Sequence, residues 1–132
     1  MWRGIRPLHK LLLRDFETAF QFNITPVFRE FLLEHNAGVP TSGIFPTTVK
    51  ERKIAKLLDF SDRYSVKGAW AINKRLREQI GEKRIIIGKD SLGNFICLER
   101  HYKHQTVVVW NHLTGEFEES LLDIAALLRC II

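Results

Sequence analysis

The sequence predicts an α+β fold: a single domain in which an antiparallel β-meander packs against N-terminal, middle and C-terminal helices. Three observations favour it. Before residue 81, apolar residues mostly recur at the three- and four-residue spacing of amphipathic helices. From residue 84 onward, short β-branched and apolar runs alternate with polar turns. Helical spacing then returns between Leu121 and Ile132. Three strands cannot bury both faces of a sheet, so helices must cover one of them.

Length and composition favour one soluble domain spanning residues 1–132. The chain has 132 residues, of which 45% are hydrophobic, enough for a core without disulfide or metal staples. Its two cysteines, Cys97 and Cys130, are predicted to be buried free thiols of a cytoplasmic protein. Neither a membrane span nor a signal peptide is predicted, because no apolar run is long enough. The net charge of +5 is spread along the chain and only weakly favours a nucleic-acid partner.

The first half of the chain contains the signals of three helices. Residues 8–20 have helical spacing, and Thr25-Pro26 predicts the start of a second helix, with Val27, Phe28, Phe31 and Leu32 buried. Gly38 is expected to end that helix in a left-handed conformation, and residues 37–48 are predicted to form a loop. Residues 49–60 fit a helix or a strand equally well. Residues 66–80 predict a third helix that ends at Gly81.

The second half contains the predicted meander. Residues 84–87 and 95–98 are expected to be strands joined by a turn at 89–94, in which Gly93 takes a positive φ. A polar turn over 99–105 leads to a third strand over 106–110. Another turn at 113–115 precedes the C-terminal helix.

No residue pattern calls for an enzyme or a cofactor. Phosphate-binding glycine loops and nucleophile elbows are absent from the sequence. His101 and His104, with Cys97 nearby, are the one pattern that zinc could use, but solvated turn residues are the simpler interpretation. Glu116, Glu118 and Glu119 are placed in a turn before the last helix, where carboxylates favour the helix N-terminus.

Three segments resemble one known family. Residues 24–40, reading ITPVFREFLLEHNAGVP, resemble the opening "L-P-x-x-Y-x-x-F-L-x-x-x-N-G-G-x-P" of the SUKH superfamily, the bacterial relatives of the yeast cell-wall and glucan-synthesis regulator. Residues 85–98 resemble its hairpin "I-x-I-G-x-D-x-x-G-N-x-I-x-L", and residues 108–112 its "V-Y-x-W-D-H". The likeness is clearest over residues 11–128. Ala37 and Asn111 depart from the pattern, where the family has glycine and aspartate.

The resemblance implies a strand around residues 53–58 and a non-enzymatic binding protein. Bacterial members are commonly immunity proteins that bind and neutralise the toxin domain of a cognate polymorphic toxin. The alternatives are a regulatory or scaffold protein of cell-wall or glucan synthesis and, less favoured, a nucleic-acid-binding module. The expected partner is therefore a protein, with no membrane and no cofactor. The candidate partner-binding residues are the turn and edge residues Asn36, Asp90, Asn94, Asn111 and His112, and an acidic patch of Glu116, Glu118 and Glu119.

Overall fold

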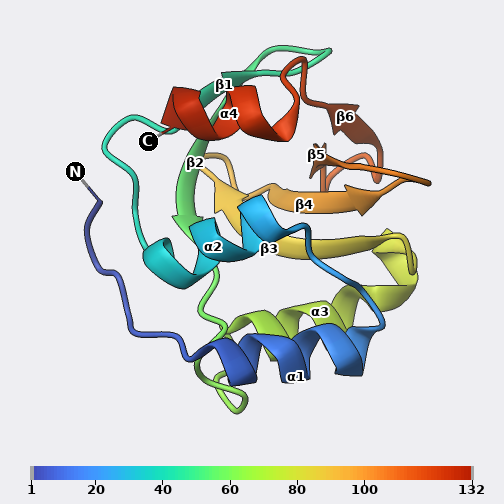
Figure 1. Ribbon diagram of the computed structural model, residues 1–132. Helices are drawn as coiled ribbons and strands as arrows, with labels where there is room; N and C mark the ends of the chain where they lie inside the picture. Colours follow the sequence, from blue (N-terminus) through green and yellow to red (C-terminus); the bar gives the residue numbers. More distant parts are fainter. Residues whose placement is uncertain (1, 132) are drawn as a thin grey trace.

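A computed structural model describes residues 2–131 of the chain and confirms the predicted α+β class (Figure 1). The described part contains four helices: α1 (Lys10–Phe20), α2 (Pro26–His35), α3 (Ala69–Ile80) and α4 (Ile124–Ile131). Its six strands are β1 (Ile44–Pro46), β2 (Glu51–Leu57), β3 (Arg84–Asp90), β4 (Phe95–Arg100), β5 (Gln105–Trp110) and β6 (Phe117–Glu119). None of the helices within residues 2–131 combines the length and apolar character needed to cross a bilayer.

The strands form one antiparallel sheet in the order β1-β2-β3-β4-β5-β6. The sheet curls until its two outer strands meet. There the Thr48 backbone N–H donates to the Glu119 carbonyl at 2.9 Å, and the Leu121 N–H donates to the Pro46 carbonyl at 3.0 Å. Because these bonds satisfy backbone groups at both outer strands, the curl removes edges that would otherwise be open to pairing.

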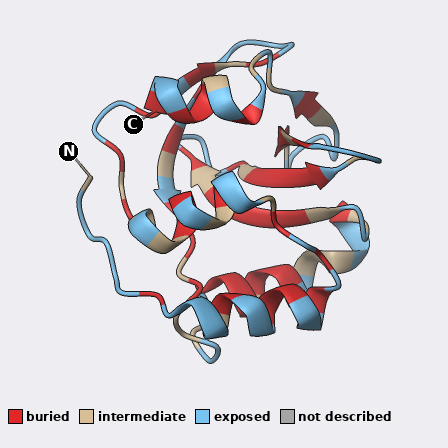
Figure 2. Ribbon diagram, in the orientation of Figure 1, coloured by how far each residue is buried: buried red, intermediate tan, exposed pale blue. Residues whose placement is uncertain are grey.

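The helices bury their apolar faces against the sheet and one another (Figures 1 and 2). α1 and α3 lie side by side, where Phe16 and Phe20 of α1 contact the ring of Trp70 of α3 at centroid distances of 5.4 and 6.0 Å. α4 packs against β1 and β5. Asn73 of α3 donates to the Ile86 carbonyl and accepts from the Ile86 N–H. Its side-chain amide thus forms the two hydrogen bonds that a neighbouring strand would otherwise form with Ile86 of β3.

The meander has more strands than the sequence predicts. β3, β4 and β5 confirm the three expected strands, and β2 confirms the strand that the family resemblance placed around residues 53–58. The predicted loop over 37–48 is wrong in part, since it contains β1. β6 was also missed. Both missed strands are three residues long, too short for an alternating pattern to show, and they exist because each pairs with a longer neighbour.

The end of α2 differs from the expectation at Gly38. Ala37, not Gly38, has the left-handed φ, at 63°. Gly38 is needed for another reason: a Cβ there would lie 2.8 Å from the His35 carbonyl oxygen and 2.9 Å from the Trp2 ring. The glycine therefore allows the N-terminal segment, whose Arg3 pairs with Val39, to cross close to the helix end.

Two predicted core residues lie at the surface. Val27 is 53% exposed, because the first turn of α2 borders an open groove shared with Leu128 and Arg129 of α4. Cys130 is exposed on α4, and its thiol lies 3.1 Å from the Ile44 carbonyl oxygen. Cys97 is buried as predicted, and burial raises its pKa to about 12, which keeps the thiol protonated.

The β3–β4 turn generates the first testable prediction. Gly93 has a φ of +85°, as predicted, and nothing but His112 lies within 4 Å of where its Cβ would be. We expect Gly93→Val to lose roughly 1–3 kcal/mol of unfolding free energy through backbone strain alone. Gly93→Asn, which tolerates this conformation, should lose less. Urea denaturation of the three proteins measures the difference, and equal midpoints for Val and Gly would contradict the strained turn.

Candidate functional site

The predicted partner-binding residues divide into a buried and an accessible group. Asn36, Asp90, Asn94 and Glu118 are 0%, 3%, 4% and 5% exposed. The accessible group consists of Asn111, which is half-buried, and three exposed residues, His112, Glu116 and Glu119. The predicted set is therefore not one surface in this structure, and its buried members have structural partners inside the molecule.

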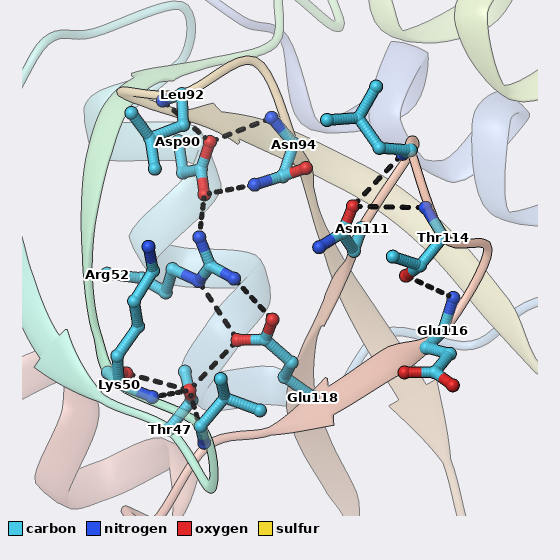
Figure 3. Close-up of polar contacts among 12 residues, drawn as sticks. Thr47, Lys50, Arg52, Asp90, Leu92, Asn94, Asn111, Thr114, Glu116 and Glu118 are labelled. Atoms are coloured by element: carbon cyan, nitrogen blue, oxygen red, sulfur yellow. Dashed lines mark hydrogen bonds and ion pairs between the residues drawn. The ribbon is translucent and has the colours of Figure 1, made fainter.

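A buried arginine, Arg52 of β2, binds Glu118 of β6, the last strand of the sheet (Figure 3). Its Nε donates to Glu118 Oε1 at 2.9 Å, and its Nη2 donates to the other oxygen of the same carboxylate. Nη1 lies 3.6 Å from Asp90 Oδ2. The hydroxyl of Thr47, which follows β1, lies 3.1 Å from Glu118 Oε1. This Arg52 cluster (Arg52, Asp90, Glu118 and Thr47) thus joins residues of β2, β3 and β6 and the end of β1.

Asp90 closes the β3–β4 turn from inside. Its Oδ1 accepts from the backbone N–H groups of Leu92 and Asn94, at 2.9 and 2.7 Å, and its Oδ2 accepts from the Asn94 side-chain amide at 3.1 Å. The Asn94 side-chain oxygen accepts from the His112 N–H at 3.3 Å and lies 2.9 Å from His112 Nδ1. A continuous polar chain therefore runs from Arg52 to the surface at His112.

The prediction that Glu116, Glu118 and Glu119 lie in a turn before the last helix is wrong. Glu118 and Glu119 belong to β6, and Glu116 immediately precedes it. Successive residues of a strand point to opposite faces, so Glu119 is exposed while Glu118 enters the Arg52 cluster. The acidic patch is consequently reduced to Glu116 and Glu119, and reversing the charge of Glu118 would place a cation against Arg52.

The two remaining asparagines also have backbone partners. Asn111 accepts from the N–H groups of Leu113 and Thr114 in the β5–β6 turn, at 3.0 and 3.3 Å. Asn36 accepts from the Phe60 N–H at 2.8 Å and donates to the carboxylate of Asp59 at 2.9 Å. Asn36 thus connects the end of α2 to the segment that follows β2.

The electrostatics of these buried groups keep their carboxylates ionised. Hydrogen bonds from Arg52 lower the pKa of Glu118 below its ordinary value, and they outweigh the opposing effect of burial. Burial alone would raise the pKa of Asp59, but hydrogen bonds from Ser61 and Asn36 and the charge of Arg6 lower it overall. Both carboxylates therefore stabilise the fold as anions.

One row of side chains crosses the sheet and reaches the surface. Each member lies directly opposite the next on the neighbouring strand, which puts all of them on one face: Lys56, Lys89, Phe95, Trp110 and Phe117. The three aromatic rings stack, with centroids 5.9 Å apart for Phe95–Trp110 and 6.5 Å apart for Trp110–Phe117. The Arg84 guanidinium lies 3.8 Å from the ring centre of Phe117. We call the five paired residues, from Lys56 to Phe117 and without Arg84, the cross-strand row.

The cross-strand row brings partly accessible aromatic rings to the surface of the sheet. Phe95 and Phe117 are half-buried, Trp110 is 8% exposed between them, and Lys56 is exposed. Aromatic and arginine side chains held rigidly at a surface supply most of the affinity in protein interfaces. The sheet fixes the rings in place, so little side-chain entropy is lost when a partner covers them.

The histidines proposed as metal ligands have other contacts. The rings of His101 and His104 stack with centroids 4.7 Å apart, and His101 Nε2 lies 2.9 Å from the Thr106 hydroxyl and 3.1 Å from Glu99 Oε1. Across residues 2–131, no three His, Cys, Asp or Glu side chains come together in a way that could hold a metal ion.

Sequence reasoning missed Arg52 and the cross-strand row. Arg52 was visible only as one member of a basic stretch with Lys50, Lys53 and Lys56, but it occupies an inward position of β2, whereas Lys53 points outward. The row requires the register of five strands, which no local pattern contains. The alternation of buried and exposed positions in β2 would have identified Arg52 once that segment was assigned as a strand.

The Arg52 cluster generates a stability prediction. Arg52→Met leaves two buried carboxylates without their cation, and we expect it to lose about 3–5 kcal/mol. Glu118→Met should also be strongly destabilising. The double substitution should lose clearly less than the sum of the two, because it leaves no partner of this pair unpaired. Denaturant unfolding of the four proteins gives the coupling energy, and strictly additive losses would show that the two side chains do not act as a pair.

A second prediction concerns pH. The folded-state pKa of Glu118 lies below its ordinary value of 4.5, so its contribution to stability is complete above that value and disappears as the pH falls through the folded-state pKa. We therefore expect unfolding free energy to decrease with acid below about pH 5. Glu118→Gln should be less stable at neutral pH and show a shallower decrease. A decrease of the same slope in both proteins would assign the acid sensitivity to other carboxylates, Asp59 first.

Comparison with known proteins places this architecture in a family. A family model described as SUKH_6, SMI1-KNR4 cell-wall, matches residues 10–123, which include α1 and all six strands. No curated protein and no solved structure matches the chain. The matched segment covers well over half of the sequence, and the predicted hairpin motif is present as the Asp90-closed turn. The chain therefore belongs to the SUKH superfamily, in its SMI1-KNR4 cell-wall family.

Proposed function

We propose that this protein is an immunity protein: a cytoplasmic, non-enzymatic protein that neutralises a cognate bacterial polymorphic toxin by binding the toxin domain. The observation that carries the proposal is membership of the SUKH superfamily over residues 10–123. Bacterial members of that superfamily commonly have this role. Neutralisation by binding needs a surface large enough to cover an active site, on the order of 1,200–2,000 Å² in total.

The cross-strand row supports the proposal as the centre of such a surface. It presents stacked aromatic rings on a rigid sheet, with Glu119 two residues from Phe117 on the same side of β6. Of the eight residues predicted from the sequence, His112, Glu116 and Glu119 are exposed at or near the β5–β6 end of the sheet. We assign them to the rim of the interface, where charged side chains affect association rate more than affinity.

A second function is favoured by the description of the family. The family is described by the cell wall, which is consistent with a regulatory or scaffold protein of cell-wall or glucan synthesis. Such a protein would use the same kind of rigid binding face on a different partner. The two functions differ in what the partner is and in whether the chain protects a cell from a toxin.

The first function predicts that a neighbouring reading frame encodes a polymorphic toxin, and co-expression of the chain with that toxin tests it. We expect the wild-type chain to restore growth and to form a complex with the purified toxin domain. Phe95→Ala with Phe117→Ala should weaken that complex by about tenfold or more, because each truncation removes an aromatic anchor. Lys74→Ala with Arg75→Ala, on the exposed side of α3, is the matched double variant and should bind as wild type does.

Circular dichroism and thermal midpoints establish that both double variants are folded before binding is compared. A chain that neither binds the toxin nor protects the cell would contradict the immunity function. Protection that survives in the Phe95 and Phe117 double variant with unchanged affinity would remove the cross-strand row from the interface.

A further inference from the structure

A basic cavity lies at the lysine end of the cross-strand row. Its volume is about 300 Å³, and it is bordered by the N-terminal segment, β2, the end of β3 and the loop before α3. Four cationic side chains line it: Arg6, Lys56, Lys67 and Lys89. Asp59 is the one acidic residue among the lining residues.

The carboxylate of Asp59 in the cavity already has a cationic partner. Asp59 Oδ2 lies 2.9 Å from Arg6 Nη1, and Oδ1 accepts from the Asn36 amide and from the Ser61 N–H and hydroxyl. These contacts fix the carboxylate in place and oppose its protonation. The charge of Asp59 therefore offsets that of Arg6, and the three lysines remain as an excess of positive charge.

The three lysines have no carboxylate within ion-pair distance in the part of the chain that the structure describes. Lys56 and Lys89 are also directly opposite each other on β2 and β3. Like charges in that arrangement destabilise a sheet. Replacing one of the two lysines with a neutral residue would remove this repulsion, although Lys89 also lies over the Phe95 ring, 5.8 Å from its centre.

We propose that this cavity is an oxyanion-binding site that receives an acidic side chain, Asp or Glu, of the protein partner. This inference rests on the proposed function and adds the chemistry of the partner. Lysine suits the role because its ammonium group is a compact charge on a flexible stem, able to follow a carboxylate that a partner inserts. The stacked rings beyond Lys89 continue the same face, so one partner segment can place its carboxylate in the cavity and apolar side chains on the half-buried rings of Phe95 and Phe117.

The net charge of the chain agrees with an acidic partner. An excess of five positive charges would slow association with a basic toxin domain and speed association with an acidic one. The cavity concentrates part of that excess at one end of the proposed interface, where it would determine register as well as rate.

The test uses the purified full chain, labelled with ¹⁵N, at an ionic strength of about 20 mM, where surface charges are weakly screened. The probes are an acetylated and amidated peptide Gly-Glu-Glu-Gly, the same peptide with Gln in place of Glu, and inorganic phosphate. We expect the Glu peptide to shift the amide signals of Leu57, Gly68 and Lys89 and to saturate them. The Gln peptide should produce no saturating shifts, and phosphate should bind more weakly than the Glu peptide.

The matched variants are Lys56→Gln with Lys89→Gln in the cavity and Lys74→Gln with Arg75→Gln on α3, which remove the same charge. The cavity variant should bind the Glu peptide about tenfold more weakly, and the α3 variant should stay within about twofold of wild type. The cavity variant should also have a higher thermal midpoint, because the opposed lysines no longer repel each other.

Equal loss of peptide affinity in the two double variants would overturn the site, since net charge alone would then explain binding. Phosphate that binds the cavity more tightly than the Glu peptide would overturn the assignment to a protein carboxylate. Neither result depends on a toxin, so a failure here leaves the immunity function to be judged by protection. A failure of protection, in turn, leaves the peptide result intact.

Discussion

Arg52 lies inside the curled sheet, where its guanidinium binds Glu118 of β6 and faces Asp90 at the end of β3. A cation with two carboxylates in an apolar interior is stable only while its geometry is kept, because each charge has given up its water. β2 and β3 are neighbours, but β3, β4 and β5 separate β2 from β6 in the order of the sheet, so Arg52 reaches Glu118 only when the sheet is curled. The backbone hydrogen bonds from Thr48 to Glu119 and from Leu121 to Pro46 complete the same closure.

The buried polar groups hold the surface that we assign to binding. Asp90 and Asn94 fix the β3–β4 turn, and the residues just outside that pair, Lys89 and Phe95, are two members of the cross-strand row. The family motif in this hairpin therefore has a structural meaning here. Its aspartate, glycine and asparagine shape the turn, while the side chains beside them face outward. A partner could be exchanged by altering the outward residues without disturbing the turn.

The distribution of charge separates the interior from the exterior. The Arg52 cluster contains one cation and two carboxylates, so its excess charge is negative and enclosed. The excess positive charge of the chain lies outside. The lysines of the basic cavity contribute to it, because Asp59, the acidic residue that lines the cavity, pairs with Arg6 and not with them. Charges that fold the protein are paired at short distance, whereas charges available to a partner are unpaired and exposed to solvent. This difference separates the structural residues from the candidate binding residues more clearly than residue type does.

The sequence by itself determined the α+β class, the four helices, the central hairpin with its positive-φ Gly93 and the family, because each depends on periodicity, turn chemistry or a motif within a short window. Only the tertiary structure decided the positions of β1 and β6, the burial of Glu118 and the left-handed conformation of Ala37. The cross-strand row and the basic cavity also required it. Lys56 and Lys89 are 33 positions apart and become neighbours through strand register, and register is a property of the paired strands rather than of either segment alone.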